Sequence, residues 1–165
     1  MSKVITFSRY FPSYHPRKGE ETFFVEKFWE GIGESYFDQY KEARLGNFEP
    51  KYHTIRAGNR WKVGDKFSPR VWSGKPRRSK QIIIAPDIEI KKIWDFEMDE
   101  CGIFSIDSKY LLYDFLSSEM DPEIKLAKND GLSQDDFFHW FMPNFNKPKA
   151  FKGQIICWNE NINYG

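Results

Sequence analysis

The pattern of hydrophobic and polar positions predicts a chain that mixes short strands with short helices. Apolar, β-branched and aromatic runs predict strands at 4–8, 51–56, 66–72, 81–85, 88–96, 102–106 and 151–158. Helical spacing and helix-end signals predict helices at 20–32, 36–45, 121–131 and 133–141, and they leave 107–118 undecided. Because strands and helices do not alternate regularly, this order favours an α+β fold over a doubly wound parallel sheet.

Prolines refine the predicted strands. Pro69 stands near the middle of the run 66–72, which predicts that this strand lies at a sheet edge or carries a bulge. Pro86 and Asp87 predict a kink between the runs 81–85 and 88–96.

Length and composition are those of one ordinary folded domain. The chain has 165 residues, of which 40% are hydrophobic and 30% charged, and it contains no low-complexity tract, which argues against disorder. No apolar run is long enough to span a membrane, and residues 1–6 lack the apolar region of a signal peptide. Cys101 and Cys157 are too few for a disulfide scaffold or a cysteine-based zinc site. We therefore expect a cytoplasmic protein without a membrane partner.

The charges are unevenly distributed although the net charge is only +1. Residues 1–80 hold 17 Lys and Arg against 9 Asp and Glu, whereas residues 81–165 hold 8 against 15. The segment 51–80 carries ten basic residues and a single acid, together with Trp61 and Trp72. A basic segment with interleaved aromatic rings is typical of an RNA or nucleotide surface, the alternative being a solvated strand face with a charged loop tip.

Several common catalytic motifs are absent. The chain has no Walker loop, no dinucleotide-binding glycine fingerprint and no nucleophile-elbow pentapeptide. Its three histidines, His15, His53 and His139, are isolated in the sequence, and we expect them to be structural or surface residues rather than metal ligands. The sequence therefore predicts neither a metal nor a cofactor.

Three motifs occur in a characteristic order. They are Lys51-x-x-Thr54-Ile55-Arg56 followed by Trp61-Lys62-Val63-Gly64-Asp65, then Leu126-Ala127-Lys128-Asn129-Asp130-Gly131-Leu132 followed by Phe137-Phe138-x-Trp140, and finally Phe151-Lys152-Gly153-Gln154-Ile155-Ile156-Cys157-Trp158. Together they resemble the ASCH domain family, small members of the PUA-like superfamily. The resemblance covers about 51–158 and the first strand.

This resemblance implies a fold. It implies a single ASCH/PUA-like domain over 1–165, built on a compact β-barrel of about five to six strands with flanking helices. Residues 9–50 would then be an insertion, and 73–120 would be a second region longer than a minimal family member needs.

The resemblance also implies a site. The family is associated with RNA-related roles, and some small bacterial members are amidohydrolases that deacetylate N4-acetylcytidine with a lysine, a threonine three residues later and a glutamate. The first two catalytic positions match Lys51 and Thr54, and the third matches Asp130, which is one methylene shorter. The shorter side chain weighs against an identical activity, because a displacement of about 1 Å in a catalytic group costs on the order of a hundredfold in rate.

The chemistry of these three residues is coherent by itself. A threonine hydroxyl becomes nucleophilic when a base takes its proton, and a lysine becomes such a base when burial lowers its pKa. In a regular strand Lys51 and Thr54 would point to opposite faces, so a shared site requires a bulge or turn between them. The alternative is that Lys51 is a surface charge, Thr54 a strand residue and Asp130 a helix-end residue.

Five further residues are candidates for ligand binding. Arg56 can bind a carbonyl, a phosphate or a developing negative charge. Trp61 and Trp72 are candidates for stacking on bases because both lie in the basic segment. Arg77 and Arg78, at an expected hairpin tip, are candidates for contact with a phosphate backbone.

Three hypotheses follow. The first is a binding module that recognises a nucleobase or modified nucleoside of RNA in a pocket lined by Lys51, Thr54, Arg56 and Asp130. The alternative is a metal-independent amidohydrolase that deacetylates N4-acetylcytidine or a related acylated nucleoside. The third is a protein-binding module that uses the aromatic-rich segment 9–50. The first two depend on whether Lys51, Thr54 and Asp130 meet in space.

Overall fold

The computed structural model describes residues 2–33, 48–112, 116 and 120–165. Three helices are α1 (Phe24–Ile32), α2 (Pro122–Asn129) and α3 (Gln134–Phe141). Nine strands are β1 (Lys3–Phe7), β2 (His53–Ala57), β3 (Lys66–Trp72), β4 (Gln81–Ile83), β5 (Ile88–Glu89), β6 (Lys92–Met98), β7 (Phe104–Ile106), β8 (Lys109–Tyr110) and β9 (Phe151–Cys157). The predicted α+β class is confirmed.

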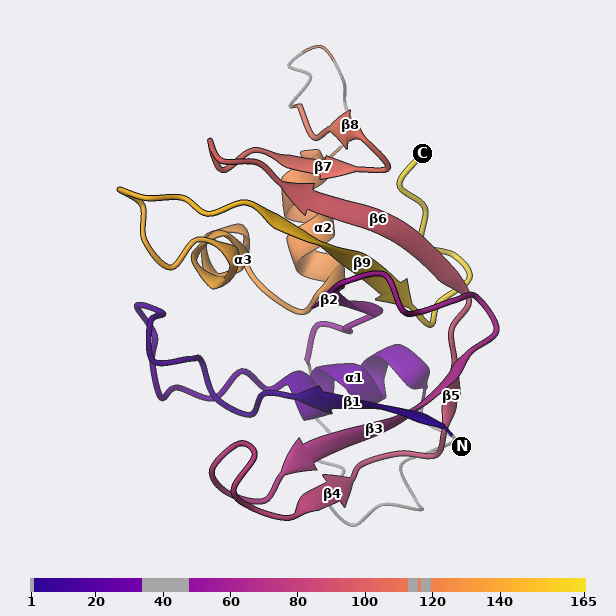
Figure 1. Ribbon diagram of the computed structural model, residues 1–165. Helices are drawn as coiled ribbons and strands as arrows, with labels where there is room; N and C mark the ends of the chain where they lie inside the picture. Colours follow the sequence, from indigo (N-terminus) through magenta and orange to yellow (C-terminus); the bar gives the residue numbers. More distant parts are fainter. Residues whose placement is uncertain (1, 34–47, 113–115, 117–119) are drawn as a thin grey trace.

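The strands form two sheets (Figure 1). In the smaller sheet β3 is central, with β1 parallel to it on one side and β4 and β5 antiparallel to it on the other. The larger sheet is antiparallel throughout, in the order β2-β9-β6-β7-β8. Figure 1 shows α1 beside the smaller sheet and α2 and α3 beside the larger one.

The two sheets are not closed into a barrel. β1 is an edge of the smaller sheet and β2 an edge of the larger one, and no ladder joins them within the described ranges. A side chain bridges the two edges: Arg56 Nη2 donates to the carbonyl oxygen of Thr6 at 2.6 Å. The expected closed barrel is therefore not confirmed.

One hydrophobic core serves both sheets and all three helices. At its centre Phe28 of α1 lies between Phe7 of β1 and Trp158, with ring centroids 5.1 Å apart in each pair. Phe67 of β3 completes this cluster. Large rings fill the space between the sheets, which accounts for part of the high aromatic content of a short chain.

Most predicted elements are confirmed, with shifts at their ends. α2 and α3 begin as expected, because Asp121 accepts from the N–H of Glu123 and Ser133 accepts from the N–H of Asp136. α1 begins at Phe24 rather than near residue 20. The predicted helix 36–45 lies outside the described residues.

The predicted strand 88–96 is two strands in different sheets. Between them Ile90 N–H donates to Asp65 O, and Lys91 N–H donates to Cys157 O. The main chain therefore crosses from the smaller sheet to the larger one at this point. The apolar pattern continues through the crossing because Ile88 and Ile90 are buried in the shared core.

Pro69 lies in the central strand of its sheet, so the predicted edge position is wrong. A bulge does lie opposite Pro69, but its extra residues belong to the partner segment and not to the strand that contains the proline. β4 pairs with Arg70–Trp72 and β5 pairs with Lys66–Phe67, so the four residues 84–87 lie opposite only two, 68 and 69. The predicted kink at Pro86 and Asp87 falls in this bulge.

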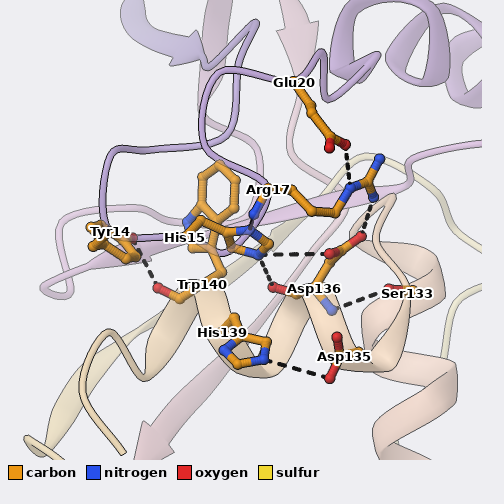
Figure 2. A network of polar contacts seen from close by, with 9 residues as sticks. All are labelled: Tyr14, His15, Arg17, Glu20, Ser133, Asp135, Asp136, His139 and Trp140. Atoms are coloured by element: carbon orange, nitrogen blue, oxygen red, sulfur yellow. Dashed lines mark hydrogen bonds and ion pairs between the residues drawn. The ribbon is translucent and has the colours of Figure 1, made fainter.

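Hydrogen bonds and ion pairs join the segment that precedes α1 to α3 (Figure 2). Buried His15 accepts from the N–H of Arg17 through Nδ1, so its Nε2 carries the proton and donates to Asp136 O at 3.1 Å. Arg17 pairs with the Asp136 carboxylate at 2.6 Å, and the Tyr14 hydroxyl donates to Trp140 O at 2.9 Å. The network fixes the position of α3, whose Trp140 lines the candidate site.

Candidate functional site

The main chain at Lys51 is held on two sides before β2 begins. Its N–H donates to Lys27 O of α1 at 2.8 Å, and its carbonyl oxygen accepts from Trp158 Nε1 at 3.2 Å. A Cβ at Gly31 would lie 2.0 Å from this carbonyl oxygen, so only glycine allows α1 to come so close. Lys51 is therefore directed into the protein by its main chain.

Asp130 is positioned by the end of α2. The helix closes with the N–H of Leu132 bonded to Ala127 O and the N–H of Gly131 bonded to Lys128 O. This glycine-dependent ending needs a left-handed residue, which Gly131 supplies with φ of 81°. A Cβ at Gly131 would also press against Lys51 Cβ at 3.3 Å. The motif delivers the Asp130 side chain next to Lys51.

Lys51 and Asp130 form a buried ion pair. Lys51 Nζ donates to the carboxylate Oδ1 of Asp130 at 2.8 Å and also to the Asp130 main-chain oxygen. Burial lowers the pKa of Lys51 to about 8, although the negative charge of Asp130 acts in the opposite direction and raises it. Burial by itself would raise the pKa of Asp130, but the charge of Lys51 and the contact with His53 outweigh it and hold that pKa below its usual value. The site thus holds an amine that titrates close to neutral pH.

His53 is a member of this site that the sequence did not single out for it. Its Nδ1 lies 3.4 Å from Asp130 Oδ1, and its Nε2 lies 2.5 Å from the Tyr164 hydroxyl. Because Nδ1 faces the Asp130 carboxylate, the neutral ring carries its proton on Nδ1, and Nε2 accepts from the Tyr164 hydroxyl, which itself accepts from Asn129 Nδ2. Burial lowers the pKa of His53, which favours the neutral ring.

Thr54 and Arg56 reach the same site from β2. They are two residues apart in the strand, so their side chains lie on the same face of the sheet. Lys51 precedes the strand, so the alternation of side chains between the two faces does not apply to it. Lys51, Thr54, Arg56 and Asp130 line one cavity of about 60 Å³. The convergence that the function hypotheses require is therefore present.

The cavity has aromatic walls and a wider neighbour. Phe7, Phe24 and Trp140 line it with the polar residues, and the Phe24 ring lies 4.4 Å from Lys51 Nζ. An adjoining recess of about 380 Å³ shares Arg56 and Trp140 with it. The two hollows are therefore neighbours along the same wall.

The geometry also limits the chemistry of the pair. Both hydrogen bonds of Lys51 Nζ go to Asp130, and no group in the described part of the chain hydrogen-bonds to the Thr54 hydroxyl. Lys51 does not act on Thr54 in this arrangement. The Thr54 hydroxyl therefore has no hydrogen-bond partner among the described residues.

Trp61 is not a surface platform for bases. It is 3% exposed, and Gln154 holds its main chain by accepting from its N–H and donating to its carbonyl oxygen. Its ring packs on Phe67 at the edge of the core. The stacking role expected for Trp61 is therefore wrong, because the ring is buried in the hydrophobic core.

The other candidates lie at the surface. Trp72 is half-buried at the end of β3, and Arg77 and Arg78 are exposed in the connection to β4. Since Phe7 of the cavity pairs with Val71, this connection leaves the sheet at the cavity end of β1. Of the ten Lys and Arg residues in 51–80, Lys51 is buried, Arg56 and Arg70 are partly buried and the other seven are exposed.

No cluster of three or more His, Cys, Asp or Glu side chains suited to a metal is found in residues 2–33, 48–112, 116 and 120–165. Nor does any helix in these ranges have the length and apolar character to cross a bilayer. Comparisons with protein-family models, curated proteins and solved structures find no match for this chain.

The shifted pKa of Lys51 predicts a pH-dependent stability. Between about pH 8 and pH 10.5 the native lysine is neutral while the unfolded chain still holds the proton. The unfolded state then binds more protons, so the free energy of unfolding should rise with pH, relative to Lys51→Met, by up to about 1.4 kcal/mol per pH unit. Urea denaturation of both proteins across this range measures it.

Lys109→Met, which removes an exposed lysine on β8, is the control and should follow the wild-type profile. A difference between wild type and Lys51→Met that stays flat or falls with pH would contradict the shift.

Proposed function

We propose that this protein binds a nucleobase or modified nucleoside, free or within RNA, at the cavity of Lys51, Thr54, Arg56 and Asp130. The observation that carries the proposal is the convergence of these four polar residues on one aromatic-walled hollow. Buried donors and acceptors held at fixed positions can read the polar edge of a base, while rings and a guanidinium plane face its flat surface.

The size of the cavity says how a ligand would enter. Ligand pockets measure about 300–1,000 Å³, so the 60 Å³ hollow holds only one group of a nucleoside. The adjoining 380 Å³ recess has room for the remainder. A base substituent beside Lys51 and Thr54, with the ring between Arg56 and Trp140, suits these dimensions.

The exposed basic residues would hold the rest of an RNA. Arg77 and Arg78 stand in an exposed connection at the cavity end of the smaller sheet, close to the half-buried Trp72. In this proposal the arginines contact phosphates and Trp72 remains the candidate for base stacking.

The same proposal treats the chain as a divergent PUA-like protein with an open barrel. The gap between β1 and β2, which the side chain of Arg56 bridges, would be the place where the barrel opens and the ligand enters. The expected cytoplasmic location belongs to this proposal as well.

Binding of single-stranded RNA should depend on salt. Arg77→Ala combined with Arg78→Ala is expected to weaken binding and to lower the slope of log affinity against log salt by about one for each arginine that contacts a phosphate. Fluorescence anisotropy of a labelled oligonucleotide at several salt concentrations measures this.

The charge-matched control is Lys109→Ala with Lys152→Ala, two exposed lysines of the larger sheet that line neither hollow. An affinity that does not change with salt concentration, or an equal loss of affinity in the control, would reject an RNA surface at the β3–β4 connection.

One observation favours the amidohydrolase as a second candidate. An amine whose pKa is about 8 exists partly as the free base near neutral pH. If a bound acyl group displaced Lys51 from Asp130, the amine could take the Thr54 proton, Thr54 could accept the acyl group, and the proton could pass to the departing cytosine amine. Water would then release the acyl group from Thr54.

Incubation with N4-acetylcytidine separates the two candidates. Because Lys51 Nζ is committed to Asp130, we expect binding by calorimetry without the appearance of cytidine by chromatography. Cytidine that forms with the wild type and not with folded Thr54→Val or Lys51→Ala would establish the hydrolase instead. Circular dichroism confirms that each variant is folded.

A further inference from the structure

A second recess lies where the edges of β1 and β2 face each other. It measures about 340 Å³, and it is lined by Val4–Thr6 of β1 and by Arg56, Ala57, Arg60 and Trp61. No acidic side chain of the described residues lines it. It adjoins the Lys51 cavity, because Arg56 lines both hollows.

Two of these lining residues each carry a buried N–H donor that has no acceptor. The donors are Arg56 Nε and the indole Nε1 of Trp61. The Nη2 of Arg56 is already bonded to Thr6 O, which fixes the guanidinium and leaves Nε unused. Buried donors without acceptors are rare in native proteins, and each needs an explanation such as a bound ion or water.

Positive charge surrounds the same recess. The exposed Arg60 guanidinium lies 5.0 Å from the centre of the Trp61 ring, and Lys3 Nζ lies 5.2 Å from it. Asp65 neutralises Lys3 through an ion pair, but the two arginines that line the recess keep their charge for a ligand. The unpaired edge of β1 adds main-chain polar groups to the wall.

We propose that this recess is a phosphate-binding subsite. Arg56 Nε, the Arg60 guanidinium and Trp61 Nε1 would donate to the oxygens of a phosphate monoester or diester, a charge-assisted arrangement to which arginine is well suited. Trp61 then acts through its indole N–H rather than by stacking.

The two hollows on either side of Arg56 define the ligand class. With a base substituent in the Lys51 cavity and a phosphate between β1 and β2, the ligand is a nucleotide or an RNA nucleotide rather than a free nucleoside. This assignment of the phosphate to the same ligand rests on the proposed function, whereas the anion site itself does not.

Inorganic phosphate tests the subsite directly. In ¹H–¹⁵N spectra the Trp61 indole signal, identified as the one missing from Trp61→Phe, should shift and saturate as phosphate is added. Arg60→Gln should weaken this binding about tenfold or more, because it removes one charge-assisted donor. Lys109→Gln removes the same charge at the opposite edge of the larger sheet and should bind as the wild type does. An indole signal that ignores phosphate, or equal weakening in both variants, would overturn the subsite.

A comparison of N4-acetylcytidine with its 5′-monophosphate tests whether one ligand uses both hollows. We expect tighter binding of the monophosphate, with the advantage lost in Arg60→Gln while nucleoside affinity stays unchanged. Equal affinity for both compounds would overturn the shared ligand. Phosphate binding at Trp61 without binding of either compound would overturn the proposed function and uphold the anion site.

Discussion

The burial of Lys51 against Asp130 constrains the elements around it. Removing one partner of such a pair leaves an uncompensated buried charge, which typically costs about 3–5 kcal/mol. Both partners of the pair are held in place: α1 and Trp158 hold the main chain of Lys51, and the glycine-dependent end of α2 holds Asp130. Elements distant in sequence must be correctly placed before the pair can form.

The Lys51–Asp130 pair lies near the edges of β1 and β2, where the two sheets are not joined. A closed barrel would pair the edges of β1 and β2, but here the side chain of Arg56 spans them and lines the hollows on both of its sides. The fully buried His53 and the Tyr164 hydroxyl support Asp130 from the other direction. A rigid polar group beside an open edge is an arrangement suited to recognition, since its donors need no reorganisation when a ligand arrives.

The sequence predicted what is determined locally. The strands β3 and β9 and the starts of α2 and α3 depend on apolar, β-branched and aromatic runs and on capping residues, and those signals lie within a few neighbouring positions. The crossing between β5 and β6 was missed because apolar alternation does not reveal which sheet a strand joins. Likewise, basic neighbours suggested an exposed Trp61, while long-range packing against Phe67 buries it.

The site was predicted only in part, again because local sequence patterns do not reveal long-range contacts. Lys51, Thr54 and Asp130 were named from motifs, but their meeting depends on non-local contacts of α1 and Trp158. His53 was treated as a structural or surface histidine, although its place between Lys51 and Thr54 was a signal that it could reach their partner. Tyr164 and Arg60 belong to no motif, and only the fold brings Tyr164 to His53 and Arg60 to the recess between β1 and β2.

The most direct test of the account observes the Lys51 amine while a ligand binds. In spectra of protein with ¹⁵N-labelled lysine, the Lys51 Nζ signal can be identified as the one missing from Lys51→Met. The account predicts that N4-acetylcytidine 5′-monophosphate shifts this signal saturably and leaves the exposed Lys109 signal in place. A ligand that binds with a measured affinity and leaves Lys51 unchanged would contradict the placement of the binding site at the buried pair.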